Sequence, residues 1–349
     1  MPLPQILIEF KTAAETAVER SEKGIVALIL RDSGNDTLSY SYVKETQIVK
    51  SHWSASNQDY LSKTFLGNPQ RVLVERIGAD DTYDDALNRL KNKKWNYLAI
   101  PDIAEEDVKT ISDWIIAQRG SNKSFKAVLP NSASNNEGII NFATEEIKVG
   151  NKTYSAAQYC GRIAGLIAGT ALNASCTYSV LPEVTSITES VTPDEDIDAG
   201  KLILVNDGEN IKIGRAVNSL VTLTANKTED MKKIKIVEGM DLIRDDICQT
   251  FEDNYIGIAN SYDNKLLFVN AVNVYLKGLM RSGVLYDQFE STAFIDIDAQ
   301  RVYLEEKDAS YAELSDADIK TADTGSYLFA GCRVKFQDAI EDLKFSIAM

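Results

Sequence analysis

Residues 24–32, GIVALILRD, and residues 71–77, RVLVERI, are short apolar runs rich in β-branched residues, and each is followed by a stretch with helical spacing. The same alternation of strand-like runs and amphipathic helices continues through residues 54–65, 79–92, 97–102, 104–118 and 125–130. Strands that alternate with helices in this way are typical of an open α/β sheet with helical crossovers. The sequence therefore predicts an α/β domain that closes with a helix over residues 155–173.

The second half of the chain mixes strands and helices without this regular alternation. Apolar residues at three- and four-residue steps predict helices over residues 240–251 and 264–280. Strands are predicted at residues 201–205, 211–216, 232–237, 292–299, 300–306, 327–336 and 343–349. The pattern indicates an α+β domain, so the expected fold class is α/β plus α+β.

The domain boundary is predicted at residues 184–200, VTSITESVTPDEDIDAG, which are acidic and turn-forming and lack helical periodicity. The predicted organisation has four parts. They are an N-terminal arm with a strand (1–23), the α/β domain (24–183), an acidic linker (184–200) and a C-terminal domain (201–349).

Both ends of the chain carry an apolar strand pattern, although termini are usually frayed and polar. The alternating apolar residues are Ile6, Ile8 and Phe10 at one end, and Leu343, Phe345, Ile347 and Met349 at the other. An unpaired strand offers amides and carbonyls that another chain can satisfy, so we expect these residues to form inter-subunit strands. The alternative is that the C-terminal strand completes a sheet of its own subunit, since that strand has the same alternation.

The composition argues against several kinds of partner. There are 37 Lys and Arg residues against 52 Asp and Glu residues, a net charge of −15, which disfavours direct binding of nucleic acid. No secretory signal and no run of roughly 20 apolar residues is present, so we expect synthesis in the cytoplasm and no membrane insertion. One histidine and four scattered cysteines indicate no zinc site and no disulfide framework, and we interpret the cysteines as small buried residues.

The candidates for catalysis and ligand binding are weak. A nucleotide site needs glycine-rich turns, whereas the turn after residue 77 carries Asp80, Asp81, Asp84 and Asp85, which suit a helix N-terminus and repel phosphate. The single His52 has no nucleophile-elbow pattern beside it. We therefore predict no catalytic, cofactor-binding or metal-binding residues.

Two further patterns have structural interpretations. Asp194, Asp196 and Asp198 alternate as in a calcium loop, but the glycine comes one place late and residue 205 is valine instead of glutamate. The glycines at 161, 165 and 169 form a double GxxxG, which predicts a helix packed very closely against a neighbour within a soluble protein.

Three segments carry a resemblance to a known family: residues 158–184, residues 211–223, and residues 234–285, which include IKIVEGMDLIRDD and NKLLFVNAVNVYLKGLM. Together they resemble the tail sheath proteins of contractile phage tails and of the related R-type bacteriocins, in the short form typical of Gram-positive hosts. The resemblance covers most of the chain and is most specific between residues 155 and 285.

The resemblance implies a structural protein without enzymatic activity or cofactors. Sheath subunits stack as six-fold rings around a tail tube and contract to drive the tube through a bacterial envelope. It implies that the α/β domain projects outward, that the C-terminal domain faces the tube, and that the terminal arms add strands to neighbouring subunits. Lys277 and Arg281, at the end of a predicted helix, are then expected to face the tube.

The implied partners are further copies of the chain, the tail tube protein, and baseplate and tail terminator proteins. The resemblance places assembly in the bacterial cytoplasm and the product in a phage tail or a released bacteriocin particle. Two alternatives stay open: a nucleotide-dependent enzyme with a degenerate fingerprint, and another self-assembling tubular or surface-layer protein.

Overall fold

The computed structural model describes residues 24–33 and 37–348, and this part of the chain divides into two compact units. Residues 24–238 and 339–348 form the first, here called the α/β unit, and residues 239–338 form the second, the α+β unit. The predicted N-terminal arm lies outside the described residues.

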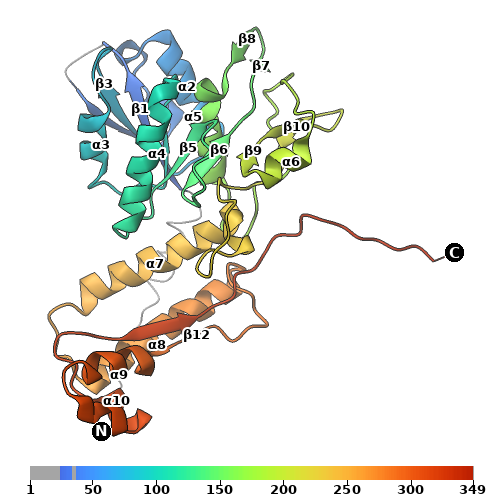
Figure 1. Cartoon of the computed structure of the whole chain (residues 1–349). Helices are drawn as coiled ribbons and strands as arrows, with labels where there is room; N and C mark the ends of the chain where they lie inside the picture. The colour runs from blue at the N-terminus through green and yellow to red at the C-terminus, as the bar shows by residue number, and fades with distance from the viewer. Residues whose placement is uncertain (1–23, 34–36, 349) are drawn as a thin grey trace, which may run out of the picture. The chain divides into compact units, whose positions relative to one another are not determined.

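A seven-stranded sheet forms the centre of the α/β unit, in the order β2-β3-β1-β4-β5-β6-β9 (Figure 1). All neighbouring strands are parallel except β2, which pairs antiparallel with β3 at one edge. The strands are β1 (Ile25–Arg31), β2 (Ser39–Tyr42), β3 (Arg71–Ile77), β4 (Tyr97–Ala99), β5 (Lys126–Pro130), β6 (Ile139–Phe142) and β9 (Lys201–Leu202).

Helices cover both faces of this sheet. Leu28 and Leu30 of β1 point into the layer formed by α2 (Ala55–Phe65) and α5 (Ala156–Gly169), while Ala27 and Ile29 point into the layer formed by α3 (Asp84–Leu90) and α4 (Glu105–Gly120). A strand buried on both faces reads as a continuous apolar run, as residues 24–30 do. The predicted open α/β architecture is thus confirmed.

The glycines of α5 allow this helix to lie against the backbone of α2. A Cβ atom built on Gly165 would be 2.1 Å from the Thr64 carbonyl oxygen, and one on Gly169 would be 1.8 Å from the Gly67 carbonyl oxygen. No side chain fits into such spaces. The predicted close helix pairing is confirmed, and its partner is the C-terminal end of α2.

The α/β unit continues past the predicted linker at residues 184–200. Part of that segment is a short helix, α6 (Pro193–Asp198), and β9 then adds to the sheet beside β6. Leu202, Leu204 and Ile213 join the same core, so the unit ends only at residue 238. Its remaining elements are β7 (Ile147–Val149), β8 (Lys152–Tyr154), β10 (Leu204–Asn206), β11 (Ile211–Ile213) and the 3-10 helices η1 (Glu45–Gln47), η2 (Lys50–His52) and η3 (Glu229–Lys232).

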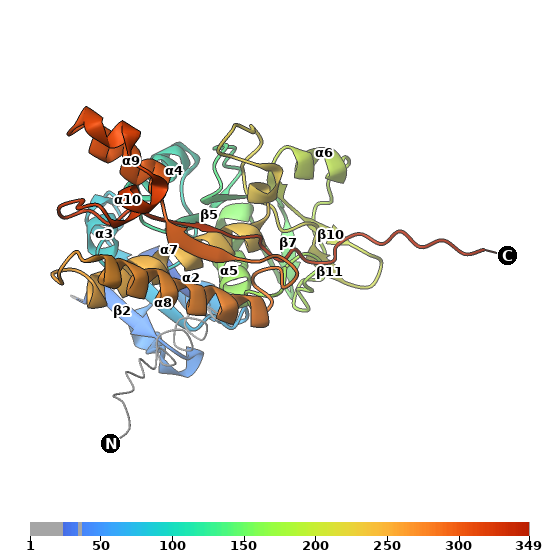
Figure 2. The same ribbon diagram turned by 90° about the horizontal axis from the view of Figure 1, so that it is seen from below.

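Two long helices lie side by side in the α+β unit (Figure 2). Phe251 packs edge-on against Phe268, with ring centroids 5.4 Å apart, and the Tyr275 hydroxyl donates a hydrogen bond to Asp246. The elements are α7 (Ile234–Asn254, whose first turn belongs to the α/β unit), α8 (Tyr262–Arg281), β12 (Thr292–Ile295), α9 (Ile297–Glu305), η4 (Ala309–Glu313), α10 (Asp316–Thr321) and β13 (Ala330–Arg333).

The predicted helices at residues 240–251 and 264–280 are confirmed, but two predicted strands were wrong. Residues 232–237 lead into the first turn of α7, because three apolar residues in a short run fit either period. Residues 300–306 fall mostly in α9. This helix begins after Asp296, because the Asp296 side chain accepts a hydrogen bond from the Ala299 amide and so acts as the N-cap.

The α2–α5 contact leads to a first prediction. Gly165→Ala adds a methyl group where the Thr64 carbonyl lies, so we expect a loss of about 1–3 kcal/mol in the free energy of unfolding, although alanine normally favours a helix. Thermal unfolding followed by circular dichroism measures it. The matched control is Gly120→Ala at the end of α4, where a Cβ would meet open space. Equal melting temperatures for both variants would contradict the prediction.

Candidate functional site

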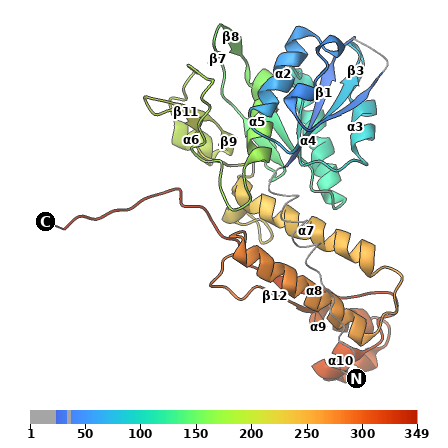
Figure 3. The same cartoon turned by 180° about the vertical axis from the view of Figure 1, so that it is seen from behind.

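Residues 339–348 form an extended segment without helix or strand (Figure 3). We call residues 339–348 the C-terminal arm. Its apolar side chains are open to solvent, with exposed fractions of 98% for Ile340, 83% for Leu343, 77% for Phe345 and 78% for Ile347. Among the described residues, no strand pairs with the arm, so the alternation at residues 343–348 has no partner in that part of the chain.

The other predicted inter-subunit residues, Ile6, Ile8, Phe10 and Met349, lie outside the described residues. Exchange of strands between copies therefore stays a prediction at both ends of the chain.

The start of the arm is held to the α/β unit by three side chains, which we call the root clamp: Ser175, Thr177 and Arg215. The Ser175 and Thr177 hydroxyls donate to the Glu341 carboxylate at 2.8 and 2.7 Å. Arg215 donates to Asp342 at 2.7 Å, and this hydrogen bond raises the pKa of the guanidinium above its ordinary value. These residues were not predicted from the sequence, because the clamp and the arm are far apart in the chain.

In the α+β unit, β12 and β13 form an antiparallel pair. On the outer side of β12, the Asn273 side chain of α8 accepts from the Ala293 amide at 2.8 Å and donates to the Ala293 carbonyl at 3.2 Å. One carboxamide thus makes the two hydrogen bonds that a neighbouring strand would make at this residue.

The outer edge of β13 differs from that of β12. Because the Ala293 backbone groups point away from β13, Ala293 and its opposite residue Cys332 are a non-hydrogen-bonded pair, and the Cys332 amide and carbonyl also point outward. Ala330, two residues earlier, has the same orientation. Both residues are exposed, and no other strand of the described chain pairs with this edge.

Lys277 and Arg281 lie on the exposed side of α8. The exposed positions of this helix recur at three- and four-residue steps, at Asp263, Leu267, Asn270, Val274, Lys277 and Arg281. Neither cation forms an ion pair with another described residue. The helix therefore presents a stripe that is apolar in its middle and basic at its C-terminal end.

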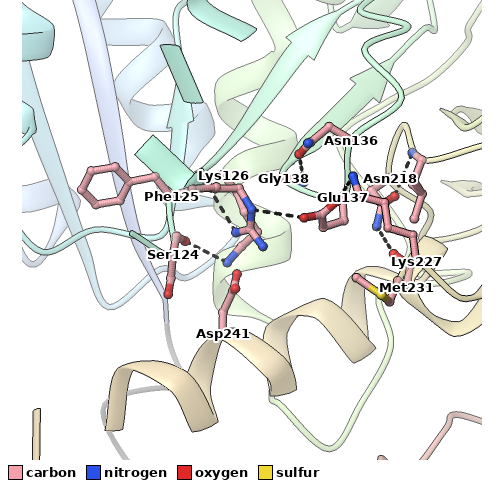
Figure 4. Close-up of polar contacts among 12 residues, drawn as sticks. Ser124, Phe125, Lys126, Asn136, Glu137, Gly138, Asn218, Lys227, Met231 and Asp241 are labelled. Carbon is pink, nitrogen blue, oxygen red and sulfur yellow. Dashed lines mark hydrogen bonds and ion pairs between the residues drawn. The ribbon is translucent and has the colours of Figure 1, made fainter. Parts of the chain in front are cut away.

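Hydrogen bonds and an ion pair hold residues 218–232 against the sheet of the α/β unit (Figure 4). The buried Asn218 side chain donates to the Met231 carbonyl at 2.7 Å, and the Ser219 amide donates to the carbonyl of Ile139 at 2.8 Å. Lys227 lies 3.0 Å from Glu137. Burial acts to raise the pKa of Glu137, but hydrogen bonds from its own backbone amide and from Lys227 outweigh it and lower the pKa. The path of the chain into α7 is thereby held in place.

Close to this network, Lys126 on β5 is almost fully buried. Its ammonium group lies 3.1 Å from the Glu238 carboxylate at the start of α7 and 5.0 Å from the centre of the Tyr97 ring. Tyr97 also donates its hydroxyl proton to Glu238. Each charge in this cluster has a partner, which is the usual condition for burying an ion pair, so the cluster is structural.

The other predicted interpretations can now be compared with the structure. His52 packs against Tyr40, and its buried Nδ1 has no hydrogen-bond partner among the described residues, so it forms no Ser/His or Cys/His couple there. Asp81 accepts from the amide of Gly78, which ties the acidic turn to itself. Asp196 accepts from Lys201 and Ser190 instead of pointing into a loop.

Cys160 and Cys176 are buried, but Cys248 and Cys332 are exposed, so the interpretation of all four cysteines as buried was wrong for two of them. Within residues 24–33 and 37–348, no group of His, Cys, Asp and Glu has a geometry that could hold a metal ion. In the same part of the chain, no helix is both long and apolar enough to cross a membrane.

One cavity of about 630 Å³ opens near the end of β5, where α/β sheets often bind ligands. Its polar side chains already have partners. Ser112 donates to Ser134 at 2.6 Å, Ser134 also contacts Ser132 at 2.8 Å, and Glu145 accepts from the Ala156 amide at the start of α5. These hydroxyl groups and the Glu145 carboxylate are therefore already engaged within the protein.

Comparison with known proteins gives a consistent result. Residues 75–219 match the phage tail sheath protein central domain, and residues 226–349 match the phage tail sheath C-terminal domain. The tail sheath protein of Clostridium phage phiCD119 is 37% identical over 360 residues, covering 99% of each chain. The phage-like element PBSX protein XkdK of Bacillus subtilis is 24% identical over 50% of this chain and 39% of its own length.

Solved structures show the same fold at low identity. The sheath tail protein of Listeria innocua aligns with a TM-score of 0.70 at 16% identity, covering 96% of this chain and all of the other. That of Desulfitobacterium hafniense aligns with a TM-score of 0.68 at 15% identity, over 85% and 92% of the two chains. The full-length match to a tail sheath protein, together with the two matched domains, decides the assignment: the chain belongs to the phage tail sheath family, and it is a structural subunit of the tail, not an enzyme.

Proposed function

We propose that copies of this chain polymerise as stacked six-fold rings around a tail tube, and that contraction of this polymer drives the tube through a bacterial envelope. In this proposal, terminal strands exchanged between neighbouring copies hold the rings together. The observation that carries it is the C-terminal arm, whose three alternating apolar side chains at 343, 345 and 347 are exposed and unpaired in the described chain.

The energy of such a pairing is sufficient for assembly. Burial of Phe345 and Ile347 contributes about 1.5–3 kcal/mol each, and each ladder hydrogen bond contributes about 0.5–1.5 kcal/mol. Six extended residues reach about 20 Å, enough to lie along a short strand of another copy. Part of this energy is lost to ordering the arm, but a polymer repeats the contact in every ring.

The open edge of β13 is the site we assign to the incoming arm. Ala330 and Cys332 present backbone amides and carbonyls there, whereas Asn273 already occupies the corresponding groups of Ala293 on β12. An isolated two-stranded ribbon is marginally stable, so a third strand also stabilises its host.

The remaining partners follow from the family. We infer that α8 faces the tube protein through its exposed basic end. We also infer that baseplate and terminator proteins lie at the two ends of the polymer. Assembly takes place in the bacterial cytoplasm, and the product is either a phage virion tail or a released R-type bacteriocin. Many weak charge contacts to the tube suit a sheath, because they can break together when it contracts.

Removing the arm tests the exchange. Deletion of residues 344–349 takes away the alternating apolar strand, so we expect a folded, soluble protein that no longer forms cylinders in electron micrographs. Lys344→Ala is the control, since it lies on the polar side of the arm and leaves the apolar residues in place. Cylinders of normal length from the truncated protein would refute the exchange.

A proline at the proposed acceptor edge tests the site. Cys332→Pro removes an amide proton that points away from β12. The β12–β13 pair therefore keeps its own hydrogen bonds, while the outer edge of β13 loses a donor. We expect normal folding by circular dichroism and a severe loss of cylinder formation. Cys332→Ser retains the amide and is expected to assemble. If the proline variant assembles as well as the serine variant, the arm binds elsewhere.

Reversing the charge of α8 tests the tube contact. With Lys277→Glu and Arg281→Glu together, we expect cylinders to form without tube inside them, since the tube contact is electrostatic while the strands are intact. The matched control is Lys307→Glu with Lys320→Glu, which reverses two charges of the same unit outside α8. Normal assembly of the Lys277/Arg281 variant on tubes would remove the basis for this contact.

A further inference from the structure

Residues 340–348 of the C-terminal arm are attached to the α/β unit by side chains. Residues 340–348 make no backbone hydrogen bond to the described chain. The contacts come from the two acidic residues: the Glu341 side chain is 12% exposed, and the Asp342 side chain, beside it, is 75% exposed. The apolar residues directly before and after this pair, Ile340 and Leu343, are exposed to solvent. Within residues 340–348, the arm is thus held at Glu341 and Asp342.

The root clamp is preorganised for carboxylates. The Ala216 amide donates to the Thr177 hydroxyl oxygen, which directs the single hydroxyl proton of Thr177 toward Glu341. The loop that carries Ser175 and Thr177 is itself fixed, because the Tyr178 amide donates to the Ile213 carbonyl at 2.9 Å. Arg215 follows β11 directly, and its Nε lies 3.7 Å from Glu341 while its other donor reaches Asp342.

We propose that Ser175, Thr177 and Arg215 act as positioning residues that anchor the root of the C-terminal arm, so that the arm projects from a fixed point of the α/β unit and can turn about that point. A fixed root limits the volume in which residues 343–349 move, which raises their effective concentration at an acceptor within about 20 Å. The benefit for assembly rests on the strand exchange proposed above, whereas the anchoring itself does not.

The kind of contact explains why the anchor permits movement. A ladder of backbone hydrogen bonds would fix the direction of the arm, but flexible side chains bound at one point leave the flanking backbone free to rotate. When neighbouring subunits change their relative orientation, the arm can follow its acceptor without leaving its own subunit.

Limited proteolysis of dilute, unassembled full-length protein tests the anchor. Trypsin cuts after Lys344, and the loss of residues 345–349 is followed by intact mass. Since the protease needs several extended residues before the cut, Glu341 and Asp342 must leave the root clamp first, and the cleavage rate reports the open fraction. We expect Arg215→Gln to be cut roughly three- to tenfold faster than the natural protein at low salt.

Three controls make the result specific. Arg215→Lys keeps the charge but cannot reach both carboxylates in the same way, so its rate is expected between the other two. Salt at about 1 M screens the Arg215–Asp342 pair and is expected to bring the natural protein close to Arg215→Gln, after correction with a small trypsin substrate. Lys212 on β11 is a cation close to Arg215 in the chain, and it contacts Asp207 and Tyr178 but not the arm. The cleavage rate of Lys212→Gln should therefore equal that of the natural protein.

The anchor is overturned if Arg215→Gln is cut at the natural rate, or if Lys212→Gln accelerates cleavage equally. This measurement needs no assembled cylinders, so its result is valid even if the strands are not exchanged between copies. In the same way, the arm-deletion test is valid even if the root clamp does not hold the arm.

Discussion

An extended apolar strand is unfavourable in water for two reasons. Its apolar side chains are exposed to solvent, and its backbone amides form hydrogen bonds only with water. This constraint applies to residues 343–348, which have the alternation of a half-buried strand but no partner in the described chain. The same constraint applies at the outer edge of β13. In the proposed assembly, a second copy pairs with both the strand and the open edge.

The rest of the α/β unit has a closed core of its own, which suits a rigid body that carries the arm. Its sheet is covered on both faces, α2 and α5 touch through glycine, and the buried Lys126 and Glu238 charges are paired. The polar network around Asn218 fixes the chain where it enters α7. In the cavity at the end of β5, the Ser112 hydroxyl donates to Ser134 and the Glu145 carboxylate accepts from the Ala156 amide, in keeping with a structural role.

Two physically different contacts serve the proposed assembly. Strand pairing buries apolar surface and is little affected by salt, so it can persist while the lattice changes shape. The cations of α8 are exposed, and contacts made by exposed charges weaken with salt and break at small cost. A sheath that must hold its copies together yet release its tube needs both kinds.

The local order of the α/β unit follows from short-range pattern, and the sequence predicted it: residues 24–130 alternate as strands and helices because burial imposes a period of 2 or 3.6 on neighbouring residues. The family followed from residues 158–184, 211–223 and 234–285, whereas the strand exchange expected from the alternation at residues 343–349 stays a prediction. Where a run was too short to distinguish the two periods, as at residues 232–237 and 300–306, the prediction was wrong.

Only the tertiary structure decided which edges stay open and what holds the arm. Asn273 closes one side of the β12–β13 pair from a separate helix, and Ser175 meets Glu341 across 166 positions of sequence. The extent of the compact α/β unit also depends on such a contact, because β9 adds to the sheet beside β6 after residues 184–200, which were predicted to form a linker. Such contacts join single residues that are remote in the chain, so they leave no periodic signal in the sequence, whereas burial along one helix or strand does.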